Sequence, residues 1–477
     1  MSDPGPLFAR AAGLATAYRR GIGAAKQRPD HTYAESLADW QAPTPESGLD
    51  QEAVLEELVR RAGPGLHAST GPRFFGWVIG ASHPAGVAAD WMTSAWGQNV
   101  GNHTAAPAAA AAETVAAGWL VELLGLPSES SVGFVTGATM ANLVGLAAGR
   151  SEVLRRVGWD VEAGGLFDAP PIRVVVGEDV HVSAMSALQF LGLGHRRVVK
   201  VATDAEGRML PSALAAALAG TSGPLIVMLQ AGQINTGACD PFEQLVPIAR
   251  EHGAWIHVDG AFGLWAKVAP GRAALAAGVE SADSWATDGH KWLQTPYDCG
   301  FAIVRDADAH RRAMAFGASY LPAVAAGERD PTHYVPELSR RARGFTTWAM
   351  LRHFGRAGLA EMVERHCRLA RQIADALRDE LGIEVANAVE LNQVILRFGA
   401  GLAAEEGDHA TLATIARLQQ DGVAFAGGSH WRGRWLMRVS VSGHGTTAED
   451  ASRTAEAIRA AWRDVRGRNV PPSGESP

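Results

Sequence analysis

Residues 255–268 read WIHVDGAFGLWAKV, and residues 281–304 read SADSWATDGHKWLQTPYDCGFAIV. The first stretch opens on an apolar run that is typical of a buried strand and that ends at Asp259. The second stretch places Lys291 in an apolar neighbourhood, where a lysine is unusual. Because a buried carboxylate and a buried lysine both need partners, this pair directs the search for a site.

Similar apolar runs recur on both sides of Asp259. The segments expected as strands are SVGFVTG, IRVVVGED, RRVVKVA, PLIVMLQAG, AWIHVDGAF and CGFAIVRD, and helix-like segments such as PSALAAALAG and DPFEQLVPIAREHG separate several of them. Strands that are rich in Val, Ile and Leu and alternate with helices predict an α/β domain with a mostly parallel sheet covered on both faces. Ligands of such sheets gather at the carboxyl ends of the strands, so we expect the chemistry there.

The rest of the chain divides by pattern into further segments. We expect a helical arm over 1–85, a large domain over 86–335, a smaller α+β domain over 336–465 and a disordered tail over 466–477. The final helix, TTAEDASRTAEAIRAAWRDV, opens with Thr446 or Thr447 as a cap and with an acidic Glu449 near its start.

Composition restricts the class of protein. The 477 residues are 47% apolar and 19% charged, with a formal net charge of -7, so the length suits an enzyme-sized globular chain and nothing calls for nucleic acid. The N-terminus lacks a signal-peptide pattern, and no run approaches a membrane span. Cys239, Cys299 and Cys367 are scattered, so neither a metal site nor a disulfide framework is expected, and a reducing cytoplasm fits.

Four strand ends carry residues that could take part in chemistry, and each also has a purely structural interpretation. The turn 136–139, TGAT, could receive a phosphate or be a plain turn. His181 could be a structural histidine, Asp259 a cap or a salt-bridge partner, and Lys291 a surface lysine. Together, a phosphate cradle, a planar stacking group, a buried carboxylate and a lysine are the parts that hold pyridoxal 5'-phosphate.

With these residues in place, the chain resembles the group II pyridoxal-phosphate-dependent decarboxylases, which include the aromatic-amino-acid and glutamate decarboxylases. The segments that carry the resemblance are PRFFGWVIG, APAAAAAETVAAGWLVELLGLP, TGATMANL, HVSAMSAL, HVDGAFG, DGHKW, RRARGFTTW and MRVSVSGHGTTAED. HVDGAFG and DGHKW, with 32 residues from Asp259 to Lys291, are the specific part. The resemblance implies a fold-type-I α/β architecture with a seven-stranded type of sheet, conversion of an L-amino acid to its amine and CO2, and a homodimer with the active site at the interface.

The resemblance also implies roles for the residues around the cofactor ring. Lys291 looks like the lysine that forms the Schiff base, and the amino acid substrate would displace it. Asp259 looks like the partner of the pyridine nitrogen. Ala261 looks like the small residue beneath the ring, and His181 like the imidazole stacked over its other face.

Around the phosphate group of the cofactor, several residues differ in type from those of the better-known relatives. The expected phosphate loop and its neighbour are Gly137, Ala138, Thr139 and His290. Gln233 and Asn235 occupy a stretch where better-known relatives carry threonines near the cofactor, so amides replace hydroxyls there. Asp288 stands where those relatives have an asparagine. Because a carboxylate repels a phosphate, we expect Asp288 to face a donor such as a hydroxyl or a backbone N–H.

Matching the pocket-forming segments of the aromatic decarboxylases suggests the residues around the substrate side chain, which are Trp77, Val78, Asn99, Gly101 and His103. An amide, a glycine and an imidazole replace mainly apolar walls, so we expect a pocket that is more polar or roomier. The family assigns protonation of the substrate carbon to a tyrosine on a loop from the other subunit. Tyr334 is the nearest candidate and Tyr320 is a second, although Tyr334 could instead only pack the loop.

Other functions use the same residues. A carbon–carbon lyase or aldolase and an aminotransferase would need the same electron sink, so decarboxylation rests on the resemblance. A non-catalytic paralogue that binds the cofactor would be expected to lack Lys291 or Asp259, and both are present.

Overall fold

The computed structural model describes residues 3–315 and 328–468. The described chain forms two compact units. Unit 1 consists of the described residues within Met1–Ala81, Arg371–Ala386 and Val394–Pro477, and unit 2 of those within Ser82–Ala370 and Asn387–Gln393. The expected boundary at residue 335 differs from this division, because the chain stays with unit 2 up to Ala370. The N-terminal segment, expected as a separate arm, groups with the C-terminal segments.

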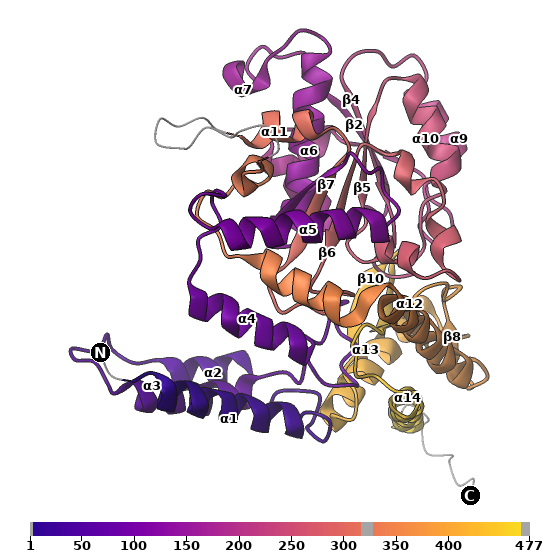
Figure 1. The fold of residues 1–477 in the computed structure, drawn as a ribbon. Helices are drawn as coiled ribbons and strands as arrows, with labels where there is room; N and C mark the ends of the chain where they lie inside the picture. The colour runs from indigo at the N-terminus through magenta and orange to yellow at the C-terminus, as the bar shows by residue number, and fades with distance from the viewer. Residues whose placement is uncertain (1–2, 316–327, 469–477) are drawn as a thin grey trace, which may run out of the picture. The chain divides into compact units, whose positions relative to one another are not determined.

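Unit 2 contains most of the regular structure (Figure 1). Its strands are β1 (Ser131–Val135), β2 (Arg173–Gly177), β3 (Val199–Val201), β4 (Leu225–Gln230), β5 (Trp255–Asp259), β6 (Ser284–Asp288) and β7 (Gly300–Val304). Its helices are α4 (Pro84–Trp96), α5 (Pro107–Leu123), α6 (Ala138–Arg155), α7 (Val161–Gly164), α8 (Val182–Phe190), α9 (Pro211–Leu218), α10 (Phe242–Glu251), α11 (Ala307–Met314) and the first part of α12 (Arg343–Arg378).

The seven strands form one sheet in the order β1-β7-β6-β5-β4-β2-β3. Strand β7 pairs antiparallel with β1 and β6, whereas β6, β5, β4, β2 and β3 pair in parallel. The mostly parallel sheet is therefore confirmed. Strand β6, between β5 and β7, was not among the expected strands, although it leads directly to Lys291.

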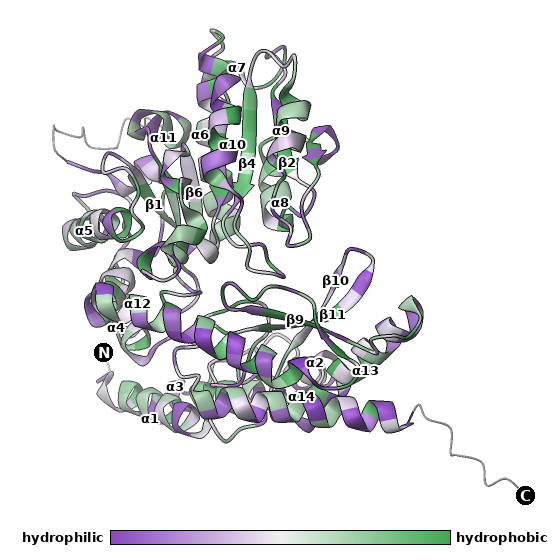
Figure 2. Ribbon diagram, turned by 90° about the vertical axis from the view of Figure 1, so that its right-hand side faces the viewer, coloured by the Kyte–Doolittle hydropathy of each residue, from purple (hydrophilic) through white to green (hydrophobic). Residues whose placement is uncertain are grey.

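The sheet is buried on both faces, as near-continuous apolar strands predict. Along β4 every residue is buried, and most of the strand is coloured hydrophobic in Figure 2. Helix α6 packs against β4, β5, β6 and β7 and also contacts α8 and α11. The core on this face of the sheet contains Leu146, Ala147, Val153, Val174, Val176, Ala184, Leu188, Ile226, Met228 and Trp255. Helix α6 thus crosses this face of the sheet, with its first residue, Ala138, at the carboxyl end of β6 and its last turn near the start of β5.

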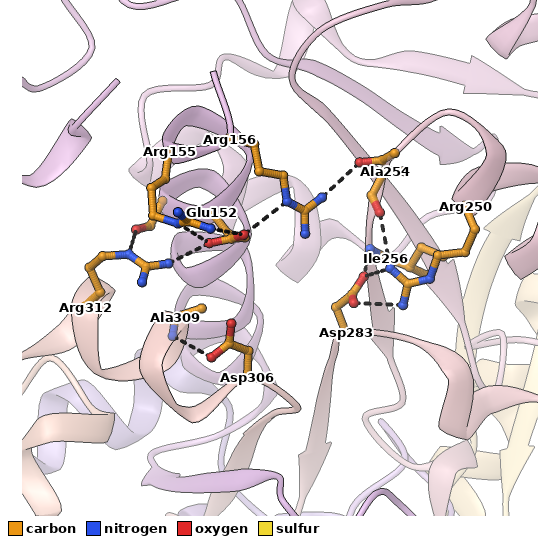
Figure 3. Close-up of polar contacts among 12 residues, drawn as sticks. Glu152, Arg155, Arg156, Arg250, Ala254, Ile256, Asp283, Asp306, Ala309 and Arg312 are labelled. Carbon is orange, nitrogen blue, oxygen red and sulfur yellow. Dashed lines mark hydrogen bonds and ion pairs between the residues drawn. The ribbon is translucent and has the colours of Figure 1, made fainter. Parts of the chain in front are cut away.

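Ion pairs hold the opposite edge of the sheet, where β5 and β6 begin (Figure 3). Asp283, just before β6, accepts two hydrogen bonds of 2.7 Å from Arg250 and a third of 2.7 Å from the backbone N–H of Ile256. Glu152 on α6 binds Arg155 and Arg312, which ties α6 to α11. The strands are therefore held firmly at the edge remote from the expected chemistry.

Unit 1 contains the smaller sheet, in the order β10-β11-β9-β8. Its elements are α1 (Gly5–Gly21), α2 (Tyr33–Trp40), α3 (Gln51–Ala62), β8 (Ile383–Val385), β9 (Gln393–Phe398), α13 (Ala404–Asp421), β10 (Gly427–Trp431), β11 (Arg434–Ser440) and α14 (Ala448–Arg468). Thr447 caps α14, as expected, but its partner is Asp450 rather than Glu449. Helix α14 also runs past the expected limit at residue 465.

The expected helices near the N-terminus are confirmed as α1 and α3, yet none of the residues in α1, α2 or α3 is buried. Within the described ranges, no helix combines the length and the apolar character that a membrane crossing would require.

Candidate functional site

Asp259 is the last residue of β5, and its carboxylate is buried at the carboxyl edge of the sheet. Its Oδ2 accepts a hydrogen bond of 3.0 Å from Nδ2 of Asn142 on α6. Its Oδ1 accepts one of 3.2 Å from the backbone N–H of Ala261. An ionised carboxylate only accepts hydrogen bonds, and both contacts match that state. Asp259 is thus held in place from two sides and still faces a pocket, which His181, Ala261 and Lys291 also line.

Lys291 lies in the turn that follows β6, and its side chain is only 14% exposed. Its Nζ is 3.0 Å from Oδ2 of Asp288. The chain contains only three other lysines. Of these, Lys26 is largely exposed and Lys267 pairs with Glu280. Lys291 is the lysine that lines the pocket with Asp259.

Asp288 confirms the expectation that it would face a donor. Its Oδ1 accepts a hydrogen bond of 2.6 Å from the backbone N–H of Ala138, the first residue of α6. This carboxylate therefore stabilises the positive end of the helix. The next N–H groups, on Thr139 and Met140, have no partner within the helix and remain suited to an anion.

His290 is packed beside Asp288 rather than in the pocket wall. Its Nε2 is 3.5 Å from Oδ1 of Asp288, and its Nδ1 accepts a hydrogen bond from the backbone N–H of Cys299. Its ring stacks on Tyr297, with 4.3 Å between the centroids. Burial lowers the pKa of His290, so the imidazole is neutral. His290 supports the segment that carries Lys291.

His181 is the N-cap residue of α8, and its Nδ1 accepts a hydrogen bond from Oγ of Ser183 at 2.7 Å. This contact orients the ring. His181 lines the same pocket as Asp259, Ala261 and Lys291. The structure therefore brings together four residues that the sequence predicted, and they come from three separate strand ends.

The remaining wall of this pocket was not predicted. Gln230, Gly232, Ile234 and Phe262 complete the lining. Gln233 instead points into its own loop, where Oε1 accepts the backbone N–H groups of Asn235 and Thr236. Asn235 is buried but is not part of the pocket wall, which receives Ile234 from this stretch.

The residues predicted around the substrate do not line this pocket either. Within unit 2, Oδ1 of Asn99 accepts the backbone N–H of Arg340, and the carbonyl of Gly101 accepts that of Thr332. His103 Nδ1 is 2.6 Å from Asp330, a hydrogen bond that raises the pKa of His103. All three positions anchor the segment that follows residue 328.

Trp77 and Val78 belong to unit 1 and have positive φ angles of 54° and 55°. Trp77 is exposed, whereas Val78 is fully buried. A positive φ is strained for a β-branched residue and is typical of functional segments.

Tyr334 ends a short 3-10 helix, and its ring lies 4.3 Å from the guanidinium of Arg329 and 5.2 Å from the ring of His310. It does not line the pocket of Lys291 in the same chain. Tyr320 lies outside the described residues.

A family model described as the pyridoxal-dependent decarboxylase conserved domain matches residues 33–399. The chain belongs to this decarboxylase family. Among its relatives, the aromatic-L-amino-acid decarboxylase of Bacillus atrophaeus is 28% identical over 361 residues, covering 74% of this chain and 73% of that protein. The L-2,4-diaminobutyrate decarboxylase of Rhizobium meliloti is 27% identical over 455 residues, covering 91% and 87%.

The crystal structure of Oryza sativa TDC with PLP and tryptamine has a TM-score of 0.88 to this decarboxylase at 24% identity, covering 96% of this chain and 97% of that one. The fold-type-I architecture is thereby confirmed. The family makes the chain a pyridoxal-phosphate-dependent carboxy-lyase that acts on an amino acid.

The pocket of this decarboxylase has the chemical groups that pyridoxal phosphate needs. A buried amine on Lys291 can bond to an aldehyde, and the acceptor carboxylate of Asp259 suits a protonated ring nitrogen. The methyl side chain of Ala261 suits a flat ring, and the start of α6 offers N–H groups to a phosphate. Asp288 leaves fewer N–H groups for that phosphate than the sequence suggested, because it occupies the N–H of Ala138.

Proposed function

We propose that this decarboxylase holds its cofactor between His181 and Ala261, with Lys291 as the attachment point and Asp259 at the ring nitrogen. The single observation that supports this proposal is the pocket in which Lys291, Asp259, His181 and Ala261 meet. Bound pyridoxal phosphate supplies an electron sink that accepts the electrons released when CO2 leaves the substrate. Asp259 keeps a proton on the ring nitrogen, because its two hydrogen bonds hold it as an acceptor.

In the same proposal, Gly137, Ala138 and Thr139 form the phosphate end of the site. Asp288 has a double role there: its Oδ2 positions the amine of Lys291, and its Oδ1 fixes the first turn of α6. Asn235 shapes the loop behind Ile234 and contributes to cofactor binding through that loop.

We propose further that the substrate carries a polar side chain. Asn99, Gly101 and His103 do not line the pocket of Lys291 in the same chain, but His103 is paired with Asp330 and lies 3.3 Å from Glu328, so this stretch is charged rather than apolar. The Rhizobium meliloti relative, whose name specifies a diamino acid as its substrate, fits this expectation. A screen of L-amino acids with amine, aldehyde and CO2 measured together tests it.

We expect polar L-amino acids to be turned over faster than tryptophan or phenylalanine, and we expect His103→Leu together with Asn99→Leu to shift this preference toward apolar substrates. A hydrogen-bonding pocket discriminates strongly against substrates that leave its polar groups unpaired. An unchanged substrate profile in the double variant would refute the pocket assignment, and aldehyde as the main product would overturn amine formation.

We propose that Tyr334 of a second subunit protonates the substrate carbon. The contacts of Tyr334 use its ring and its backbone carbonyl, which accepts from His310, so the hydroxyl is not needed for packing. Tyr334→Phe should therefore have the melting temperature of the wild type, while its rate of amine formation falls by about 100-fold, as for loss of a general acid. Stopped-flow and steady-state amine assays measure this, and full amine-forming turnover would remove Tyr334 from the role.

We propose that the enzyme is a homodimer, which the exposed apolar surface supports. Unit 2 exposes large apolar side chains on α4 and α12, namely Trp91, Met92, Trp96 and Trp348, and α1 to α3 of unit 1 expose Phe8, Tyr33, Trp40, Val54 and Leu58. Apolar surface of this kind marks an interface. Sedimentation velocity should give a dimer, and a fully active monomer would contradict the proposal.

A further inference from the structure

Behind Asp259, a row of buried polar side chains crosses from β5 to β6 and α6. Trp255, His257 and Asp259 alternate along β5 and therefore point to the same face of the sheet. Asn142 of α6 and Ser284 of β6 lie among them. His257, Asn142 and Ser284 are fully buried, so each hydrogen bond between them matters.

These five side chains form one continuous series of hydrogen bonds. Trp255 Nε1 donates to Ser284 Oγ at 2.9 Å, and Ser284 Oγ is 2.8 Å from His257 Nδ1. His257 Nε2 is 2.8 Å from Asn142 Oδ1, and Asn142 Nδ2 donates to Asp259 Oδ2 at 3.0 Å.

The chemistry of the two ends sets the direction of every bond in between. An indole N–H can only donate, so Ser284 accepts from Trp255. At the other end Asp259 accepts from Asn142, so the amide oxygen of Asn142 accepts from His257 Nε2, and Nδ1 of the neutral imidazole is left to accept from Ser284. His257 therefore carries its proton on Nε2 and donates to the amide oxygen of Asn142. That amide presents its N–H to Asp259, which must accept. Burial lowers the pKa of His257 to about 3, so the imidazole stays neutral and the direction does not reverse near neutral pH.

Two glycines on α6 make room for this arrangement. A Cβ on Gly145 would lie 2.7 Å from Cε1 and 2.8 Å from Nδ1 of His257. A Cβ on Gly149 would lie 2.6 Å from Cδ1 of Trp255. Such distances are too short for any real contact, so only glycine lets α6 approach the two rings this closely.

We propose that Asn142, His257 and Ser284 are positioning residues that hold Asp259 as an acceptor toward the ring nitrogen of the cofactor. Each bond in the series polarises the next, and all of them point their donors at Asp259. The inference rests on the proposed role of Asp259 and adds three residues that act through it. None of the three lines the pocket itself.

The test compares Asn142→Asp and Ser284→Ala with the wild type. Asn142→Asp keeps the shape but replaces the donor with a second carboxyl group beside Asp259. We expect the dissociation constant for pyridoxal phosphate to rise about 10- to 100-fold, as for the loss of a hydrogen bond to a charged group. Ser284→Ala leaves His257 Nδ1 without its donor, and we expect a rise of about 3- to 10-fold.

A second readout separates positioning from general loss of stability. With 15N-labelled pyridoxal phosphate, the ring-nitrogen signal of the wild type should be that of a protonated nitrogen at neutral pH. In Asn142→Asp the ring nitrogen should lose its proton at a lower pH, because two adjacent carboxyl groups share one proton and Asp259 no longer presents a full negative charge to the ring nitrogen. Activity is not needed for either measurement.

Matched controls are available on the same elements. Thr287→Val removes another buried hydroxyl from β6, one that has no hydrogen-bond partner, and should leave the dissociation constant within about twofold of the wild type. If Asn142→Asp does not fold, Gly145→Ala serves as the test of the inference instead, because its added Cβ displaces His257 and leaves every donor and acceptor in place. Gly118→Ala on α5, where a Cβ has open space, is its control.

The inference about Asn142, His257 and Ser284 would be overturned if the folded variants of this series, Ser284→Ala and Gly145→Ala included, kept wild-type cofactor affinity and an unchanged ring-nitrogen signal. That result would leave the proposed function intact. If the wild-type protein does not attach pyridoxal phosphate at Lys291, or if Asp259→Ala leaves the ring-nitrogen signal unchanged, the proposed function itself fails. The two failures are therefore distinguishable.

Discussion

Lys291→Ala is expected to abolish amine formation, with turnover falling by about 10³-fold or more. Lys291 is the lysine whose Nζ lies in the pocket, 3.0 Å from Asp288 and 5.9 Å from the centre of the Phe262 ring. No other residue of the lining carries an amine, so no neighbour can replace it. The variant should also lose the visible absorbance band that the wild type shows with bound cofactor.

Lys267→Ala is the matched control for this prediction, because Lys267 is also mostly buried and pairs with Glu280 at 3.1 Å. We expect it to keep the visible band and most of the turnover. An active Lys291→Ala variant with an unaltered spectrum would contradict the role of Lys291. Release of CO2 and amine from a polar L-amino acid, together with the absorbance spectrum, measures both outcomes.

Asp259→Ala is expected to lower turnover by about 10²- to 10³-fold, the range found when one preorganised electrostatic partner is removed. Affinity for pyridoxal phosphate should fall as well, because the ring nitrogen loses its anionic partner. Asp259→Asn is the sharper variant: its amide would place a donor opposite either Asn142 Nδ2 or the backbone N–H of Ala261. The turnover of Asp259→Asn should therefore be nearly as low as that of Asp259→Ala.

Asp283→Asn controls for the loss of a buried carboxylate at the other end of the same strands. It weakens the contacts to Arg250 and Ile256 that Figure 3 shows, at a cost of about 1.5–3 kcal/mol, and so lowers the melting temperature. We expect its cofactor affinity to stay within about twofold of the wild type. An Asp259→Ala variant that matched Asp283→Asn in both properties would reduce Asp259 to a structural role.

The strands were predictable wherever burial and apolar character coincide. Residues 225–230 and 300–304 are apolar in sequence and buried in the structure, so each was expected and each is a strand. Strand β6 reads SWATD and escaped prediction, because Ser284 and Asp288 look like surface residues. Their polar groups are satisfied by Trp255, His257 and Ala138, which are remote in sequence.

The candidate site was predictable where residue type alone restricts chemistry. A lysine in an apolar stretch and a carboxylate at a strand end indicated Lys291 and Asp259, and the like-charge argument indicated that Asp288 would face a donor. Asn142 was not predictable, because it sits in a helix that reads as apolar packing and meets Asp259 only in the folded chain. The same applies to Ile234, which replaces Asn235 at the pocket wall.

The most direct test of the account is to locate the lysine that bonds to the cofactor. The protein loaded with pyridoxal phosphate is reduced with borohydride, digested and mapped by mass spectrometry, and the chain offers only Lys26, Lys200, Lys267 and Lys291 as candidates. We predict one modified peptide, with the mass addition on Lys291. Modification confined to another lysine, or no stoichiometric modification, would contradict the proposed site.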